Sequence, residues 1–129
     1  MLKGKKVYIC SPLSADTDKQ RAHNMDMARF YLDRMSELYH CRTLASHAHL
    51  PLMLDDSIQE ERAAALKIGR IMLDLCDVLL ICGRRISSGM SGEIREAFEK
   101  GKEVYWYDSD RKPFELEKIH NWEELGYAV

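Results

Sequence analysis

Apolar and polar positions alternate along this chain in blocks that predict strands and helices by turns. The first block, Lys6 to Cys10, is a compact β-type run ended by Ser11-Pro12, which predicts a strand. The polar stretch Ser14 to Asp18 can cap a helix, and apolar residues then recur at helical spacing as far as Leu38. We therefore expect a strand followed by a helix.

The middle of the chain repeats this alternation. Cys41 to Ser46 is a candidate for a short second strand, and His47 to Asp56, which contains Pro51, is expected to form a loop. Ile58 to Leu75 has the length and spacing of a helix. The apolar stripe of this helix consists of Ala64, Ile68, Ile71, Met72 and Leu75.

The last third predicts two more strands with a helix between them. Asp77 to Cys82 is apolar on both faces, as expected for a central parallel strand, and Gly83 ends it. Glu93 to Lys100 reads as a helix stopped by Gly101, and Val104 to Tyr107 is another strand.

Strands that alternate with helices predict an α/β fold with three α/β/α layers and four to five mainly parallel strands, similar to flavodoxin or Rossmann folds. We expect a single domain over residues 1–129, with its core at 5–107 and a short extension of helix and loop at 108–129. Ligands of such sheets bind at the carboxyl ends of the strands. This rule selects three loops, Ser11–Asp18, His47–Asp56 and Arg84–Gly92.

Charge and composition narrow the possible partners. The 129 residues carry a formal net charge of -2, so there is no basic excess for nucleic acid or anionic lipid. The apolar run that follows the first six residues is too short for a signal peptide's apolar region, and no stretch approaches the length of a membrane span, so we expect a cytoplasmic protein. The cysteines show no CxxC pairing and are expected to be reduced and structural, with disulfides or a zinc site as the alternative.

The loop Arg84–Gly92 carries the most informative chemistry. Free backbone N–H groups at a strand-to-helix turn favour an anion, and its serines and glycines add hydroxyl donors and close backbone approach. Arg84 and Arg85 add positive charge. The Gly-Lys-Ser/Thr ending of a P-loop is absent, which argues against ATP hydrolysis of that type.

Glu93 is expected in the first turn of the next helix, where two interpretations stay open. An acid there compensates the helix dipole. Alternatively, its carboxylate is a nucleophile toward a glycosidic carbon.

Three motifs together resemble the nucleoside 2-deoxyribosyltransferase-like superfamily. They are Val7-Tyr8-Ile9-Cys10-Ser11-Pro12-Leu13, Cys76-Asp77-Val78-Leu79 and Ser87-x-Gly89-x-x-x-Glu93-Ile94-x-x-Ala97. Within the superfamily, Gly83 to Met90 and Pro51 to Asp56 are most similar to small bacterial and phage proteins of the DUF4406 and DUF7768 type.

The resemblance implies roles for individual residues. Glu93 matches the nucleophilic glutamate that attacks C1′ of an N-glycosidic bond, and Tyr8 matches a first-strand tyrosine at the site. Ser87 matches the serine that helps hold phosphate in deoxynucleoside 5′-monophosphate hydrolases. The other candidate substrate- or phosphate-binding residues are Ser11, Pro12, Leu13, Ser88, Gly89, Met90 and His47.

Gly69 departs from the family pattern. Eight residues before the position of Asp77 the family has an aspartate that assists the leaving base, and Asp74 on the same helix faces elsewhere. General-acid help is commonly worth about 10²–10⁴-fold in rate. Glycine at this position therefore argues against efficient catalysis.

The remaining candidates have simpler interpretations. His47 and His49 would share one face of an extended segment, but no third metal ligand is visible at a matching spacing. We therefore expect neither a metal nor a cofactor. Either histidine can instead reach the phosphate or base, or replace the missing acid. Asp55 and Asp56 are expected to cap the following helix, and Asp77 to accept structural hydrogen bonds. Core or interface aromatics are Trp106, Tyr107 and Trp122.

Two main functions follow. The first is an N-glycosidase or deoxyribosyltransferase that acts on a nucleoside or nucleoside 5′-monophosphate through Glu93, with hydrolysis and transfer not separated. The second is a non-catalytic nucleotide-binding or sensor module, and a third, plainer one is an interaction domain. The resemblance also implies a homo-oligomer, a dimer or larger, in which a neighbour's C-terminal region supplies part of each site.

Overall fold

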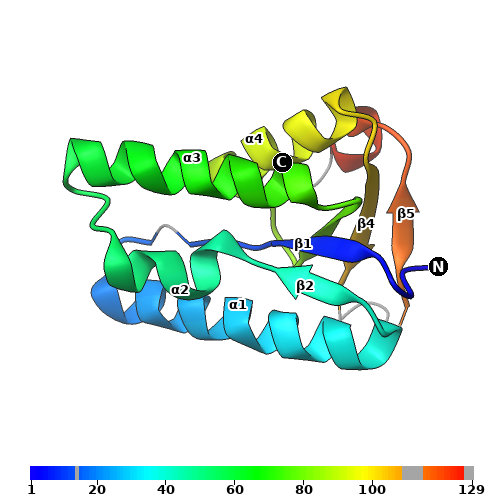
Figure 1. The fold of residues 1–129 in the computed structure, drawn as a ribbon, viewed down its shortest axis with the longest axis horizontal. Helices are drawn as coiled ribbons and strands as arrows, with labels where there is room; N and C mark the ends of the chain where they lie inside the picture. Colours follow the sequence, from blue (N-terminus) through cyan, green and yellow to red (C-terminus); the bar gives the residue numbers. More distant parts are fainter. Residues whose placement is uncertain (14, 109–114, 127–129) are drawn as a thin grey trace.

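A five-stranded sheet in the order β2-β1-β3-β4-β5 forms the centre of the molecule (Figure 1). The computed structural model describes residues 1–13, 15–108 and 115–126. The first four strands are parallel and β5 pairs antiparallel with β4, which confirms the mainly parallel sheet. The strands are β1 (Lys6–Cys10), β2 (Arg42–Leu44), β3 (Val78–Cys82), β4 (Glu103–Tyr107) and β5 (Glu117–Ile119).

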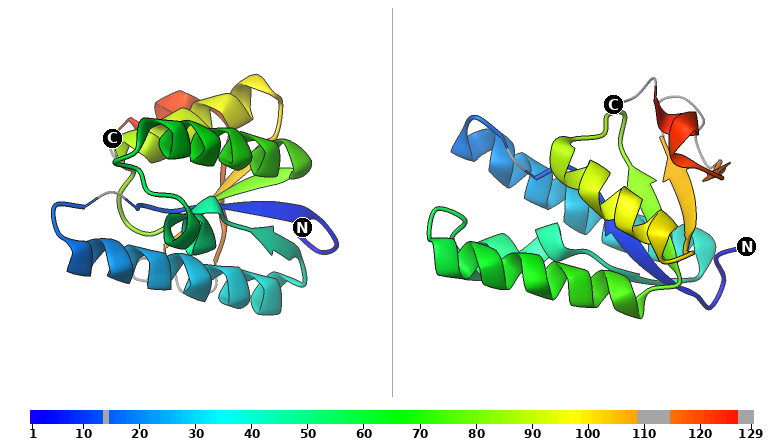
Figure 2. Two further views of the ribbon diagram at one scale, coloured as in Figure 1. Left: turned by 60° about the vertical axis from the view of Figure 1, so that its left-hand side comes forward. Right: turned by 90° about the horizontal axis from the view of Figure 1, so that it is seen from above.

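Helices cover both faces of the sheet and give the three predicted layers. α1 lies on one face and α3 and α4 on the other, as the views of Figure 2 show. α2 packs between α1 and α3. The helices are α1 (Asp18–Tyr39), α2 (Ser46–Met53), α3 (Gln59–Leu75) and α4 (Ser88–Glu99), with a 3₁₀ turn η1 (Trp122–Leu125).

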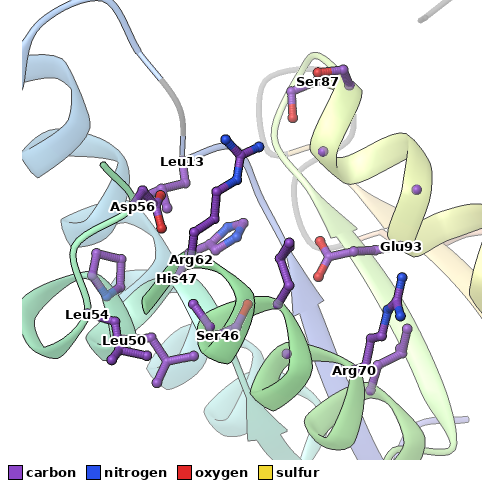
Figure 3. A pocket seen from close by; sticks show the side chains of 18 of the residues that line it. Leu13, Ser46, His47, Leu50, Leu54, Asp56, Arg62, Arg70, Ser87 and Glu93 are labelled. Carbon is purple, nitrogen blue, oxygen red and sulfur yellow. The ribbon is translucent and has the colours of Figure 1, made fainter. Parts of the chain in front are cut away.

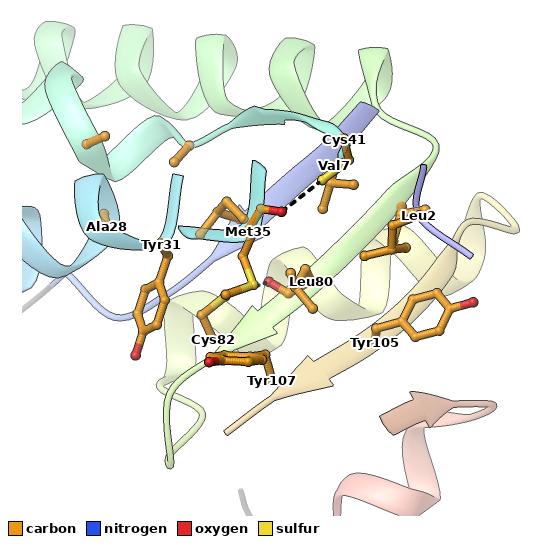
Figure 4. Packing of buried hydrophobic residues seen from close by; sticks show 14 residues of the cluster. Leu2, Val7, Ala28, Tyr31, Met35, Cys41, Leu80, Cys82, Tyr105 and Tyr107 are labelled. Atoms are coloured by element: carbon orange, nitrogen blue, oxygen red, sulfur yellow. Dashed lines mark hydrogen bonds between the residues drawn. The ribbon is translucent and has the colours of Figure 1, made fainter. Parts of the chain in front are cut away.

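Alternation along the central strands divides the core into two clusters. On β1, Val7 and Ile9 pack toward α1, whereas Tyr8 and Cys10 pack toward α3 and α4. All of β3 is buried, as its continuous apolar run predicts. Figure 4 shows the cluster on the α1 side, where the Cys41 thiol donates to the carbonyl of Met35. All four cysteines are free and buried.

The segment after β2 differs from the prediction. Ser46–Met53 is a helix, although Pro51 indicated a loop. A proline inside a helix removes one backbone hydrogen bond and crowds the preceding turn. Here the buried Ala48 anchors the helix against its neighbours, and the Leu54 N–H still bonds to the Leu50 carbonyl at 2.9 Å. Packing therefore outweighs the local cost of the proline.

α4 begins five residues earlier than predicted. Ser87 is its N-cap, and the Ser87 hydroxyl accepts from the Met90 N–H at 3.3 Å. Gly89 and Gly92, which suggested a loop, therefore lie inside the helix. Glu93 falls in the second turn, beyond the free N–H groups, so the interpretation of Glu93 as a first-turn acid is wrong.

The predicted apolar stripe of α3 is only partly packed: Met72 contacts the second core cluster, but most of the stripe faces outward. Ile68, Ile71 and Leu75 are 37%, 50% and 56% exposed, whereas Leu73 is buried. Periodicity detects an apolar face without showing which side of the helix meets the sheet.

Two aspartates before α3 do not cap it as expected. The N-cap of α3 is Ile58, which has no side-chain cap bond. Asp55 instead accepts from the Ser57 N–H and hydroxyl, and Asp56 pairs with Arg21 at 2.9 Å. Asp77, in contrast, accepts the Lys6 N–H at 3.1 Å, which confirms its structural role.

The remaining predictions concern the cap of α1, the aromatic residues and membrane-spanning segments. The cap of α1 is Thr17, and Ser14 lies outside the described residues, as do 109–114 and 127–129. Trp106 and Tyr107 are core residues, as expected, and the Trp106 indole donates to the Gly83 carbonyl at 2.7 Å. Trp122 packs on the second cluster beneath the Arg95 guanidinium. No helix in the described part of the chain is long and apolar enough to cross a membrane.

Candidate active site

A pocket of about 530 Å³ opens between α3 and α4 at the carboxyl ends of β1, β2 and β3 (Figure 3). Leu13 follows β1, His47 follows β2, and Ser87 follows β3, so each of the three loops selected from the sequence contributes to its wall. This volume lies within the range of small-molecule sites. The sheet topology therefore brings distant candidate residues to one cavity.

Glu93 lies in this pocket, and donors from β1 hold its carboxylate. The Tyr8 hydroxyl donates to Glu93 Oε2, and the Cys10 thiol donates to Oε1 at 3.6 Å. Because the single Tyr8 proton goes to Glu93, the Ser46 hydroxyl, 2.8 Å away, donates to the Tyr8 oxygen. Tyr8 and Cys10 are fully buried and two residues apart, so they reach Glu93 from one face of the strand.

Burial and these contacts act in opposite directions on the Glu93 carboxyl. Burial raises its pKa above the usual value, whereas the Tyr8 hydrogen bond, the charge of His47 and the Cys10 thiol lower it. Burial, followed by the nearby Glu93 charge, raises the pKa of Tyr8 and of Cys10 far enough that both remain protonated donors. Of Tyr8, Cys10 and Glu93, only Glu93 is therefore expected to ionise.

The N-cap and first turn of α4 form another part of the pocket wall. Ser87, Ser88 and Gly89 all line it, and a Cβ added at Gly89 or at Gly92 would meet nothing within 4 Å. Met90, in contrast, is fully buried in the core, where its sulfur accepts the Ser87 N–H at 3.4 Å. Met90 therefore supports the turn from beneath.

Other predicted residues lie beside the pocket. The Ser11 side chain is buried and outside the lining, and its carbonyl contacts His47 Nδ1 at 3.0 Å. Pro12 is also outside the lining, whereas Leu13 is part of it. Arg84 and Arg85 are exposed and do not line the pocket.

The expected pairing of two histidines on one extended face is wrong. His47 and His49 lie on α2, where two residues correspond to about 200° of rotation. His47 lines the pocket and His49 is exposed outside it. Within residues 1–13, 15–108 and 115–126, no group of three His, Cys, Asp or Glu residues is placed to hold a metal ion.

Sequence analysis missed the arginines of the pocket, Arg21, Arg62 and Arg70. Arg21 pairs with Asp56, but among the described residues neither Arg62 nor Arg70 has an ion-pair partner. Figure 3 shows both side chains, which extend from α3, among the residues that line the pocket. Gly69 and Arg70 follow Arg62 by seven and eight residues, which places all three on one side of the helix. This spacing was the sequence signal that could have revealed the two arginines.

Gly69 faces the network around Glu93. A Cβ added there would lie 3.7 Å from Ser46 Cβ and 3.8 Å from Ser46 Oγ, which is ordinary contact. The position that carries an acid in the resembled family is thus part of the pocket, with no side chain to fill it.

The profile of a family described as "Domain of unknown function (DUF7768)" matches residues 5–107. The chain belongs to the DUF7768 family. A comparison with curated proteins finds no match.

A solved structure with a similar fold is that of a 2-deoxyribosyltransferase from Bacillus psychrosaccharolyticus, described as a biocatalyst for the synthesis of nucleosides. The likeness covers 96% of the DUF7768 chain and 82% of that chain, with a TM-score of 0.62 and 15% sequence identity. The DUF7768 chain therefore has the fold of a deoxyribosyltransferase.

Proposed function

We propose that this DUF7768 chain is an N-glycosidase or deoxyribosyltransferase that acts on a nucleoside or nucleoside 5′-monophosphate, with Glu93 as the nucleophile. The observation that supports this most is the Glu93 carboxylate, held on both oxygens by buried donors and facing a small-molecule pocket. A fixed carboxylate beside a cavity is suited to attack a glycosidic carbon.

In this mechanism a Glu93 oxygen forms a bond to C1′ while the bond from C1′ to the base nitrogen breaks. The bonding electrons leave with the base, and positive charge develops on the sugar ring oxygen and C1′. Water, or a second base, then attacks C1′ and releases the Glu93 carboxylate. The Tyr8 and Cys10 donors keep the carboxylate in one orientation throughout.

Charge in the pocket supports a phosphorylated substrate. Asp56 is paired with Arg21, and Glu96 is paired with Lys100 at 2.9 Å. Among the described residues, the lining charges left without an ion pair are the Arg62 and Arg70 guanidinium groups and the Glu93 carboxylate. Two uncompensated cations fit a 5′-phosphate, with Ser87, Ser88 and Gly89 as further donors at the start of α4.

A non-catalytic nucleotide-binding module is the second candidate. Gly69 favours it, because no carboxyl group stands beside the leaving base at that position. The two candidates differ in one readily measured property, which is the release of free base.

The test is to incubate the chain with deoxynucleosides and deoxynucleoside 5′-monophosphates and to measure released base by chromatography. We expect release that falls by at least about 10³-fold in Glu93→Gln. Glu99→Gln, which changes an exposed glutamate of the same helix, is the matched control. Nucleotide binding without release in the wild type would favour the second candidate.

We also propose a cytoplasmic homo-oligomer. The exposed apolar stripe of α3, formed by Ile68, Ile71 and Leu75, supports an interface with a second copy. Four free, buried thiols support a reducing compartment.

A further inference from the structure

We propose that His47 donates the proton to the departing base and then accepts a proton from the attacking water. This inference rests on the proposed function, since it requires that the C1′–N bond is broken in this pocket. It concerns the step for which the pocket has no obvious carboxylic acid.

The need for an acid follows from the chemistry of the bond. When C1′–N breaks, its electron pair remains on a base nitrogen, and protonation there is commonly worth about 10²–10⁴-fold in rate. The ionisable side chains that line the pocket are Arg21, His47, Asp56, Arg62, Arg70, Glu93 and Glu96.

All but one of these groups are unsuited to give up a proton. Arginines keep their protons at any ordinary pH. Glu93 acts as the nucleophile, and the carboxylates of Asp56 and Glu96 are engaged by Arg21 and Lys100, each at 2.9 Å. α3 adds no acid to its pocket face, where Gly69 has no side chain. His47 remains.

The contact with Ser11 orients the His47 ring. Nδ1 lies 3.0 Å from the Ser11 carbonyl oxygen, which can only accept, so Nδ1 carries a hydrogen. Nε2 is then the nitrogen left to exchange a proton with a ligand. Ser11 is 1% exposed, so this anchor is firmly packed. Figure 3 shows the His47 ring and the Glu93 carboxylate in the same cavity.

Over the two steps His47 gives up one proton and regains one. In the first step the Nε2 proton passes to the base nitrogen as Glu93 bonds to C1′. In the second step water attacks C1′, its proton passes to Nε2, and Glu93 leaves as a carboxylate. The charged groups that share the pocket with His47 are Glu93 from α4, Arg62 and Arg70 from α3, Arg21 from α1, Asp56 from the α2–α3 loop and Glu96 from α4.

The positive charge of His47 also lowers the pKa of Glu93. The proposed mechanism requires His47 to carry a proton on Nε2 while Glu93 is ionised. Such a pair predicts a rate that falls on both sides of an optimum pH.

The experiment compares two leaving groups. One substrate is a purine deoxynucleoside 5′-monophosphate, and the other is its N7-methylated analogue, whose base is already cationic and leaves without being protonated. In His47→Gln we expect kcat for the first substrate to fall by about 10²-fold or more, and for the second by less than about 5-fold. His49→Gln, an exposed neighbour on α2, is the matched control and is expected to leave both rates unchanged.

Each other outcome overturns a defined part of the account. Equal losses on both substrates, or no loss on either, overturn the role of His47 while release that depends on Glu93 keeps the proposed function. No release from either substrate by the wild type overturns both.

The pH profile of the wild type gives a second test that needs no variant. For the unmethylated substrate, which needs a proton donor, kcat is expected to fall at alkaline pH, and for the methylated substrate this limb is expected to be absent. An alkaline limb of the same shape for both substrates would contradict the proposal.

Discussion

At the scale of single residues, the account depends on how a partly buried carboxylate is held. Burial alone disfavours the charged form of Glu93, and the Tyr8 and Cys10 donors offset part of that cost. The contacts with Tyr8 and Cys10 span 85 and 83 residues of sequence. A nucleophile held by two donors that stay protonated is available for attack in a single orientation.

Tyr8→Phe tests this arrangement. The change removes a hydrogen bond that lowers the pKa of Glu93, so that pKa is expected to rise further. Because the ionised form is the nucleophile, the acid limb of the kcat profile is expected to move to higher pH, with a loss of about 10-fold or more at the optimum. The measurement is base release across pH, with Tyr105→Phe, whose hydroxyl bonds to Glu103 outside the site, as control. An unmoved acid limb would contradict the role of Tyr8.

Residue-level sequence reasoning selected Glu93, Tyr8, His47 and Ser87 as candidates, each from a short motif or loop, and the structure brings them to the pocket or its immediate contacts. It treated Cys10 as an ordinary core thiol, because nothing in the sequence shows a contact with a residue so far along the chain. The likeness to DUF4406 proteins and the roles assigned to single residues stay predictions.

At the scale of elements, the four parallel strands were predicted from the sequence, but β5 was missed, because only helix and loop were expected at 108–129. Apolar runs such as Val78–Cys82 need no context to be recognised, since they are buried on both faces. α2 and the start of α4 could not be predicted from the sequence, because proline and glycine residues in them disfavour a helix locally. Tertiary packing stabilises α2, and the Ser87 cap stabilises the start of α4. The face of α3 could not be predicted either, since one side carries the pocket and the other an apolar stripe.

Arg62→Gln tests the role of α3 in substrate choice. Loss of an unpaired guanidinium is expected to raise KM for a nucleoside 5′-monophosphate by about 10-fold and to leave KM for the free nucleoside nearly unchanged. Lys67→Gln, an exposed cation of α3 outside the pocket, is the control for a general change in charge. Equal effects on both substrates would show that Arg62 does not read the phosphate.

At the scale of the whole molecule, the parallel sheet accounts for the site. The loops that follow β1, β2 and β3 meet at one edge, so residues 13, 47 and 87 reach one pocket although they are far apart in sequence. This convergence was predictable from alternation and topology alone. The surface proposed here for self-association could not be predicted in this way, because it depends on which helix face remains uncovered after folding.

Ile71→Glu tests the proposed oligomer. Ile71 is 50% exposed in the described chain and lies two residues, or about 200° of helix, from the pocket-facing Gly69. A charge there is expected to shift the sedimenting species toward a monomer without unfolding it, as judged by circular dichroism. Lys19→Glu, which changes an exposed lysine of α1 on the opposite face of the sheet, is the control. A wild-type chain that sediments as a monomer at every concentration would contradict the proposal.

The most direct measurement of the central claim is the capture of a covalent sugar on Glu93. A 2′-fluoro-2′-deoxynucleoside 5′-monophosphate destabilises positive charge at C1′ and slows breakdown of a glycosyl ester, so intact-protein mass spectrometry after acid quenching can detect the adduct. We predict an added mass of one fluorodeoxyribosyl phosphate, located by peptide mapping on Glu93 and absent in Glu93→Gln. Base release by the wild type with no adduct, or with an adduct on another residue, would contradict the account.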